Sequence, residues 1–130
     1  MQNYFEKDFI AIGYDKTNHL IVLKWKIAPT SAEFREGLHS LLAAIEQFKT
    51  GKVIVDTTHL GTIHPDDQQW SVTEWTQKAM QAGYSKLAII IPDDIFTQMS
   101  VEDAMNSTNN ILPFAYFSNM TPAMEWITKA

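Results

Sequence analysis

The sequence predicts an α/β fold in which helices pack on the faces of one mixed, mostly parallel sheet. Three observations lead to this prediction. Short apolar runs without polar alternation, such as Val53–Val55, are typical of buried parallel strands. Segments with helical apolar periodicity separate these runs, and proline, glycine and aspartate mark the junctions. The predicted order is β-β-α-β-α-β-α-β-α, with right-handed crossovers and one antiparallel hairpin strand at the sheet edge.

The first two strands are expected to form a β-hairpin. Two strand-like runs, Phe9–Tyr14 and Leu20–Trp25, flank the polar tract 15–19. Leu20–Trp25 is apolar on nearly both sides, which indicates a strand that is covered on both faces. Tyr4 and Phe5 precede the hairpin. They either extend its first strand or make a homodimer contact along the sheet edge.

A long helix is predicted after the hairpin. Thr30 and Glu33 have the spacing of a capping box, in which each side chain accepts a hydrogen bond from the other residue's backbone amide. Apolar residues then recur every three or four positions, which predicts one buried stripe formed by Phe34, Leu38, Leu41, Leu42, Ile45 and Phe48. Lys49 complements the helix C-terminus, and Gly51 is predicted to supply the left-handed residue that ends it.

The next helix is predicted to run from Pro65 to about Ala82 and to end at Gly83. Trp70 and Trp75 are five positions apart, which places their side chains about 140° apart on an ideal helix. Trp70 can therefore face a different surface from the core. The predicted inner face consists of Val72, Trp75, Thr76, Ala79 and Ala82.

The last third of the chain continues the alternation. Lys86–Ile91 is a clear strand prediction because its centre is entirely apolar. Ile95–Met99 is expected to form a helical turn. Ser100 and Asp103 are then predicted to cap a separate helix that ends near Asn109.

Phe114–Phe117 is predicted to be the final strand, and Thr121-Pro122 to begin the final helix, because proline is tolerated in a first helical turn. This helix is expected to bury Ala123, Trp126 and Ile127. Trp25 is likewise assigned to the core.

Composition restricts the class of function. The 130 residues, 45% hydrophobic and 19% charged, indicate one globular domain spanning residues 1–130. A net charge of −5 without a basic cluster argues against nucleic acid and anionic membrane as partners. The absence of cysteine excludes disulfides, thiol nucleophiles and thiolate metal sites. The N-terminus lacks a signal-peptide pattern and Leu87–Ile91 is too short to span a bilayer, so we expect a cytoplasmic protein.

Polar residues gather where two predicted strands end and helices begin, which is where open α/β sheets keep their sites. Trp70 is a candidate wall for a binding pocket there, and Phe96, Met99 and Met105 could line the same end of the sheet. The predicted binding surface consists of Asp56, Thr57, Thr58, His59, His64, Asp66, Asp67, Trp70, Asp93, Asp94 and Phe96.

Each of these residues also has a structural interpretation. Aspartates at strand ends commonly form turns. Asp66 and Asp67 lie in a first helical turn, where carboxylates stabilise the helix dipole, and His64 or Thr62 would be the cap. Trp70 could simply pack beneath the preceding loop.

The pattern gives little support to catalysis. A metal site would need several of the histidines and aspartates to converge, and no HExxH spacing is present. Asp56 and Asp93 could approach each other across the sheet edge and do acid–base work. However, the sequence contains no nucleophile elbow and no phosphate-binding glycine loop. We therefore expect no catalytic residue, metal or cofactor, and a metal-assisted hydrolase is the least favoured alternative.

Three segments carry a family resemblance: VIVDTTHLGTIHPDDQQW, AxxxGYSKLAIIIPDD, and PFAYFS followed by AMEWI. With the predicted element order, they resemble SpoIIAA-like, STAS-type domains, which are related to bacterial anti-sigma-factor antagonists. The resemblance spans nearly the whole chain. In the antagonists a phosphorylatable serine begins the helix after the strand that ends in aspartate. Here the corresponding run is His64-Pro65-Asp66-Asp67, which has no hydroxyl, so we expect no phosphoswitch.

The resemblance implies a non-enzymatic binding or regulatory domain, in the first place a protein-interaction module. The alternative is a carrier or sensor of a small apolar or lipid-like ligand, because the subfamily has been compared with CRAL-TRIO-like lipid-binding proteins. Such a ligand would lie between the sheet and the second and third helices. The sequence names neither the partner nor the ligand.

Overall fold

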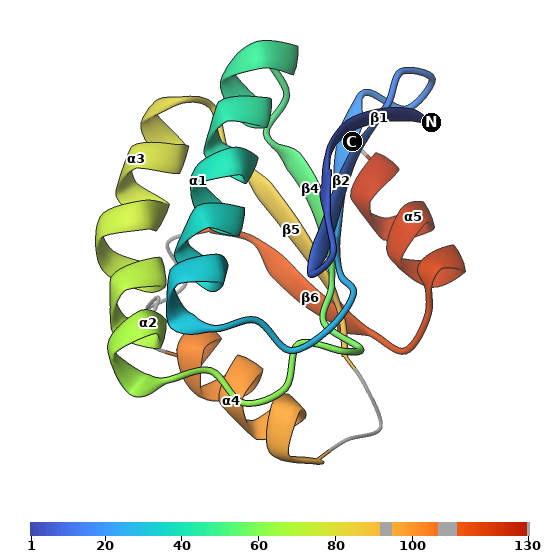
Figure 1. Ribbon diagram of the computed structural model, residues 1–130. Coiled ribbons are helices and arrows are strands. Elements are labelled where there is room, and N and C mark those ends of the chain that lie inside the picture. The colour runs from blue at the N-terminus through green and yellow to red at the C-terminus, as the bar shows by residue number, and fades with distance from the viewer. Residues whose placement is uncertain (92–94, 107–111, 130) are drawn as a thin grey trace.

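A computed structural model gives the structure of the chain and describes residues 1–91, 95–106 and 112–129. Within these ranges, six strands form one sheet with helices on both faces (Figure 1). The elements in chain order are β1 (Gln2–Lys7), β2 (Ile10–Asp15), β3 (Leu20–Trp25), α1 (Ser31–Phe48), β4 (Lys52–Asp56), α2 (Pro65–Trp70), the π-helical η1 (Ser71–Trp75), α3 (Thr76–Gln81), β5 (Lys86–Ile90), α4 (Ile95–Asn106), β6 (Phe114–Phe117) and α5 (Met120–Thr128).

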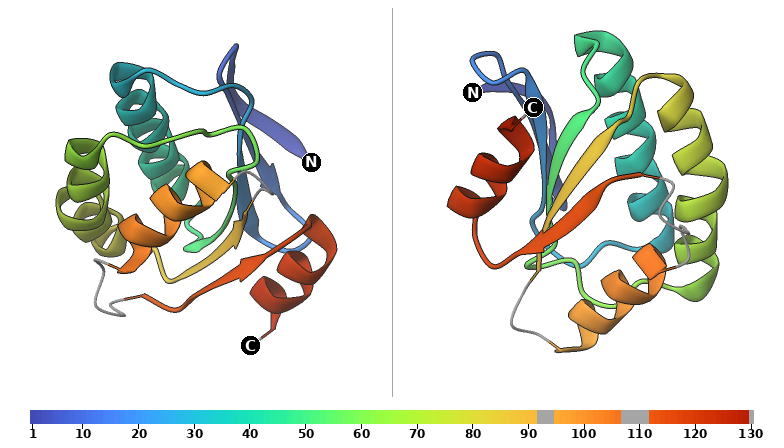
Figure 2. Two further views of the ribbon diagram at one scale, coloured as in Figure 1. Left: turned by 90° about the horizontal axis from the view of Figure 1, so that it is seen from below. Right: turned by 180° about the vertical axis from the view of Figure 1, so that it is seen from behind.

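The strands follow one another across the sheet in chain order. β1, β2 and β3 pair antiparallel, and β3, β4, β5 and β6 pair parallel. The three crossovers place α1, the α2–α3 helix and α4 on one face of the sheet, whereas α5 covers the other face (Figure 2). The prediction of an α/β fold with a mixed, mostly parallel sheet is therefore confirmed.

The predicted element order lacks one strand, β1. Two antiparallel strands, β1 and β2, lie at this edge of the described sheet, where the sequence predicted one. Only Tyr4 and Phe5 in β1 are strongly apolar, and the pairing register shifts between Asn3 and Phe5, so the strand has a weak pattern. The Tyr4 ring packs edge-on against Phe48, with 5.3 Å between centroids. A homodimer along this edge stays a prediction.

Helix α1 begins as predicted and ends differently. The Thr30 hydroxyl accepts a hydrogen bond from the Glu33 amide at 3.2 Å, and the Glu33 carboxylate accepts one from the Thr30 amide at 2.9 Å. The predicted stop at Gly51 is wrong, because Lys49, with φ of 53°, is the left-handed residue. Gly51 is needed for a close approach instead: a Cβ there would lie 1.8 Å from the Gly83 carbonyl oxygen.

The helix after β4 runs without a break from Pro65 to Gln81, close to the predicted bounds. The sequence did not predict its π-helical middle, η1, in which the Thr76 amide donates to the Ser71 carbonyl five positions earlier. Such a turn inserts an extra residue into the helix and is frequent at functional sites.

Two predictions near the C-terminus are wrong. Helix α4 begins at Ile95, so Ser100 lies inside the helix, where it is buried, and does not cap it. The predicted end of that helix near Asn109 lies outside the described residues. Trp126 is half-buried and is not a core residue. Its ring packs against the Lys86 ammonium, 4.3 Å from the centroid.

The sheet separates two hydrophobic clusters within the described residues. The larger cluster lies under α1, the α2–α3 helix and α4, and it includes Trp25, which is 1% exposed as predicted. The smaller lies under α5 and includes Ile54 and Ile127. No helix among the described residues has the length and hydropathy needed to cross a membrane.

Candidate functional site

The larger core cluster contains a cavity of about 110 Å³. It lies between the sheet and the three helical segments on that face. Aliphatic and aromatic side chains form most of its wall, which consists of Trp25, Phe34, Leu38, Leu41, Val55, Thr57, Leu60, Ile63, Ser71, Val72, Trp75, Thr76, Tyr84, Leu87, Ile89, Val101, Met105 and Leu112.

No charged side chain is among these lining residues of the described chain. Most of the polar groups in the wall donate to backbone carbonyl oxygens at 2.6 to 2.8 Å: Thr57 to Ile90, Ser71 to Gln68, Trp75 to Leu38 and Thr76 to Ser71. Tyr84 differs, because burial raises the pKa of its hydroxyl above the ordinary value of 10.0 and no other cause contributes. The cavity therefore offers an apolar and uncharged environment.

The π-helical turn forms the part of the cavity wall that the α2–α3 helix contributes. Ser71, Val72, Trp75 and Thr76 all line the cavity. In an ideal α-helix, Ser71 and Thr76 would point about 140° apart. The wider π turn brings residues five positions apart closer to one face, and the Thr76 hydroxyl reinforces it with its 2.7 Å bond to the Ser71 carbonyl. A predicted inner helical face thus becomes the wall of a cavity.

At the end of β4 the predicted polar residues form a turn. Asp56 accepts hydrogen bonds from the amide and the hydroxyl of Thr58 at 2.9 and 2.5 Å. Thr57 is buried, and both its amide and its hydroxyl donate to the Ile90 carbonyl. Thr58 and His59 are exposed. Thr57 is the one member of the predicted surface that also lines the cavity in the described chain.

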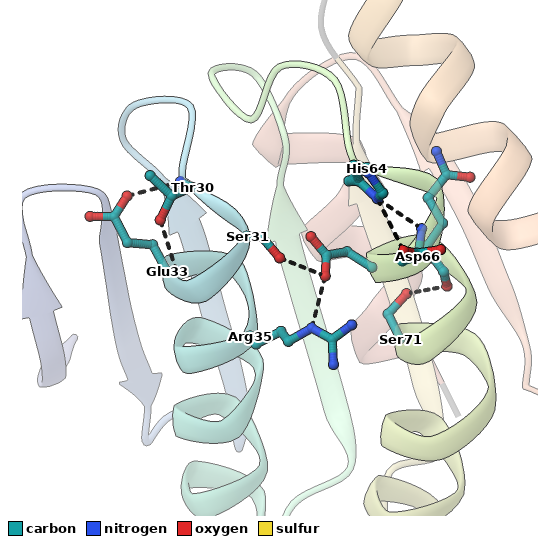
Figure 3. A network of polar contacts seen from close by, with 9 residues as sticks. Thr30, Ser31, Glu33, Arg35, His64, Asp66 and Ser71 are labelled. Atoms are coloured by element: carbon teal, nitrogen blue, oxygen red, sulfur yellow. Dashed lines mark hydrogen bonds and ion pairs between the residues drawn. The ribbon is translucent and has the colours of Figure 1, made fainter.

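The start of α2 has the predicted cap. The His64 Nδ1 atom accepts a hydrogen bond from the Asp66 amide at 3.1 Å (Figure 3). His64 and Asp66 are both exposed, with 65% and 87% of their side chains open to solvent. Asp66 is thus available to solvent in the way that the predicted acidic surface requires.

Asp67 is not part of that exposed surface, contrary to the prediction. Its side chain is 4% exposed and accepts hydrogen bonds from the Ser31 hydroxyl at 3.0 Å and from Arg35 Nε at 2.8 Å (Figure 3). These contacts join α2 to the start of α1. Asp67 therefore acts as a buried connection between two helices.

Trp70 lies beside this connection and is absent from the cavity wall. The Arg35 guanidinium carbon lies 4.7 Å from the centre of the indole, and the His39 ring meets the indole edge-on at 5.3 Å. Trp70 is half-buried. The indole thus belongs to the contact between α1 and α2, and its predicted role as a pocket wall is wrong for this cavity.

The remaining predicted residues belong to the segment around α4. Asp93 and Asp94, and the side chain of Phe96, lie outside the described part of the structure. Met99 is 56% exposed, whereas Met105 lines the cavity, from which Trp70 is absent. The described residues include no group of three or more histidine, aspartate or glutamate side chains that could hold a metal ion.

Sequence reasoning placed a ligand between sheet and helices only as an alternative, and it assigned most of the wall residues to the packed core. The apolar stripe of the first helix, with Phe34, Leu38 and Leu41, and the inner face of the next helix, with Val72, Trp75 and Thr76, were predicted only as buried surfaces. Nothing in the pattern distinguished a tightly packed interface from one that leaves a cavity.

Comparison with protein-family models, with curated proteins and with solved structures finds no match to this chain.

Proposed function

We propose that this chain is a non-catalytic binding domain that holds a small apolar molecule in the cavity between the sheet and α1, the α2–α3 helix and α4. The observation that supports it is the cavity itself, about 110 Å³ of space with an apolar wall. Protein interiors normally leave few voids larger than a water molecule. The side chains that line a cavity of this size lack packing contacts on one side, and a ligand would supply those contacts.

The cavity volume limits the size of the ligand. An engineered apolar cavity of about 150 Å³ stays dry and binds benzene. The volume here therefore fits a molecule of about one ring or a short branched chain. Long acyl chains are too large unless the wall moves.

Binding of benzene tests the proposal. We expect benzene to raise the Tm of the wild-type protein, since a ligand that binds only the folded state stabilises it by about 2.7 kcal/mol at a concentration of 100 times Kd. Two variants that place a ring in the cavity, Val72→Phe and Val101→Phe, should lose this rise. Ala43→Phe is the matched control, because residue 43 is exposed on α1 and the added ring stays outside the cavity.

Native mass spectrometry of the protein, purified without organic solvent, supplies the second measurement. A small molecule that co-purifies with wild type and Ala43→Phe, and is absent from Val72→Phe, would support the proposal. No bound molecule together with an unchanged Tm in benzene would contradict it.

A protein-interaction role is the second candidate. The exposed Thr58, His59, His64 and Asp66 support it, as does the 54% exposure of Ile27 on the loop before α1. Asp66→Lys, which leaves the buried Asp67 intact, should abolish capture of a partner without lowering Tm. A partner that still binds this variant would exclude Asp66 from the interface.

We also propose a STAS-like architecture. It is supported by the parallel β3–β6 arrangement with α1, the α2–α3 helix and α4 as crossovers, and by the position of α2 after the strand that ends in Asp56. The antiparallel strand β1 is an addition to the predicted order.

A further inference from the structure

We infer that the Tyr84 hydroxyl is a specificity-determining hydrogen-bond donor in the cavity, and that the ligand is a compact, uncharged one-ring molecule with one acceptor oxygen. The inference rests on the proposed function and adds the chemical class of the ligand. It follows from three properties of the cavity wall in the described part of the chain: one buried hydroxyl without a hydrogen-bond partner, the place of its tyrosine in the cavity lining, and no charge.

Tyr84 differs from the other polar groups of the wall. The hydroxyls of Thr57, Ser71 and Thr76 already donate to backbone carbonyls. Among the described residues, no hydrogen bond engages the Tyr84 hydroxyl, and desolvation is the only influence on its titration. A buried hydroxyl without a partner is costly, which gives a ligand acceptor a reason to bind there.

The Tyr84 side chain also belongs to the cavity wall. Among the described residues, the Tyr116 hydroxyl is the side-chain group that is both sealed by protein atoms and unpartnered. Tyr116 is not among the residues that line the cavity, whereas Tyr84 is. Tyr84 is only 6% exposed and lines the cavity, so the cavity is where we infer that its hydroxyl meets a ligand.

The wall excludes charged ligands. Burial raises the pKa of Tyr84, so the hydroxyl is protonated at neutral pH and can donate. A carboxylate or an ammonium group in the cavity would have no opposite charge among the described lining residues. Buried charges without a partner are strongly disfavoured. A carbonyl or ether oxygen on an apolar ring satisfies the tyrosine without adding charge.

Two isosteric probes test the inference: cyclohexanone, which carries an acceptor oxygen, and methylenecyclohexane, which has a CH₂ group in its place. Their affinities are measured by calorimetry for wild type and for Tyr84→Phe. We expect Tyr84→Phe to weaken cyclohexanone binding about tenfold and to change methylenecyclohexane binding less than about threefold. Equal changes for both probes would overturn the inference and leave the proposed function intact.

The carbonyl stretching band of cyclohexanone gives a readout that does not depend on the variant. On binding to wild type, the band should move to lower frequency, as a hydrogen-bonded carbonyl does. Cyclohexanone that binds with an unshifted band would overturn the role of Tyr84. If wild type binds neither probe, the proposed function itself fails.

Discussion

The α1–α2 junction, where Asp67 contacts Ser31 and Arg35, lies next to the cavity, and the two regions differ in polarity. Phe34, Leu60 and Ile63 contribute to both. On the junction side, Asp67 is paired with Ser31 and Arg35, so its charge is satisfied by the protein. On the cavity side, the wall is mostly apolar, and none of its described side chains is charged. The comparison teaches that the polar side chains at the junction are largely engaged in contacts within the protein, and that the proposed ligand site lies where polar side chains are few.

Reversing the charge of Asp67 tests whether the α1–α2 junction is stabilised by its buried polar contacts, and we expect it to have the largest effect. Asp67→Lys would place a cation beside Arg35 in a buried position. We expect it to lower the free energy of unfolding by about 3 kcal/mol, near the low end for breaking a buried pair, because Arg35 is itself 39% exposed. Urea denaturation measures the change. The control Asp66→Lys should stay within about 0.5 kcal/mol of wild type; equal losses in both variants would show that Asp67 is no helix connection.

Added volume should distinguish the cavity from the packed core around it. Val53 is fully buried and outside the cavity wall, so Val53→Leu should destabilise the protein by about 1–3 kcal/mol through overpacking. Val72 lines the cavity, so Val72→Leu should be neutral or stabilising by up to about 0.8 kcal/mol, the value of one buried methylene. Thermal and urea unfolding measure both variants. Similar losses in the two would mean that the space beside Val72 is filled.

The dependence of stability on pH above pH 10 tests the burial of Tyr84 in the cavity wall. Burial raises the pKa of Tyr84 in the folded state above its ordinary value of 10.0. Above pH 10 the unfolded chain therefore releases this proton first, and stability falls by up to about 1.4 kcal/mol per pH unit from this group alone. Below pH 10 the contribution is fully present. Tyr84→Phe should lose stability less steeply between pH 10 and 11 than wild type, and parallel profiles would contradict the burial of the hydroxyl.

The smallest expected effect concerns the π-helical turn. Thr76→Val removes the hydroxyl that donates to the Ser71 carbonyl, which should cost about 1 kcal/mol. It should also reduce the rise in Tm caused by benzene, because Thr76 holds the wall of the cavity in place. Thr73→Val is the matched control: its hydroxyl bonds to the Gln69 carbonyl on the exposed side of the same helix. If both variants respond to benzene alike, the π turn has no role in shaping the cavity.

The features that depend on local chemistry were predictable. The α1 capping box, the His64 cap and the apolar centre of β5 each follow from a short run of residues, and the structure has all three. Where two local signals competed, the prediction was wrong. Lys49 adopts the left-handed conformation that was predicted for Gly51. Gly51 is required for a different reason, the close approach of its backbone to Gly83.

The candidate site depends on distances that no local pattern contains. Asp67 was predictable as a first-turn carboxylate, but its partners Ser31 and Arg35 come from a helix more than thirty positions earlier. The π turn packs against α1 and α4, which come from distant parts of the sequence, and the cavity depends on the volume left over after every wall residue has packed. Trp70 shows the limit clearly: its position was predicted, and its neighbours were not.

The sequential order of the strands has a consequence for how this protein is made. Residues that surround the cavity extend from Trp25 on β3 to Leu112, just before β6. As the chain leaves the ribosome, each crossover adds its strand next to the previous one, so the cavity cannot close until the chain has been synthesised as far as Leu112. A bound small molecule would then stabilise only a chain that includes Leu112. A chain that ends before Leu112 would lack this stabilisation.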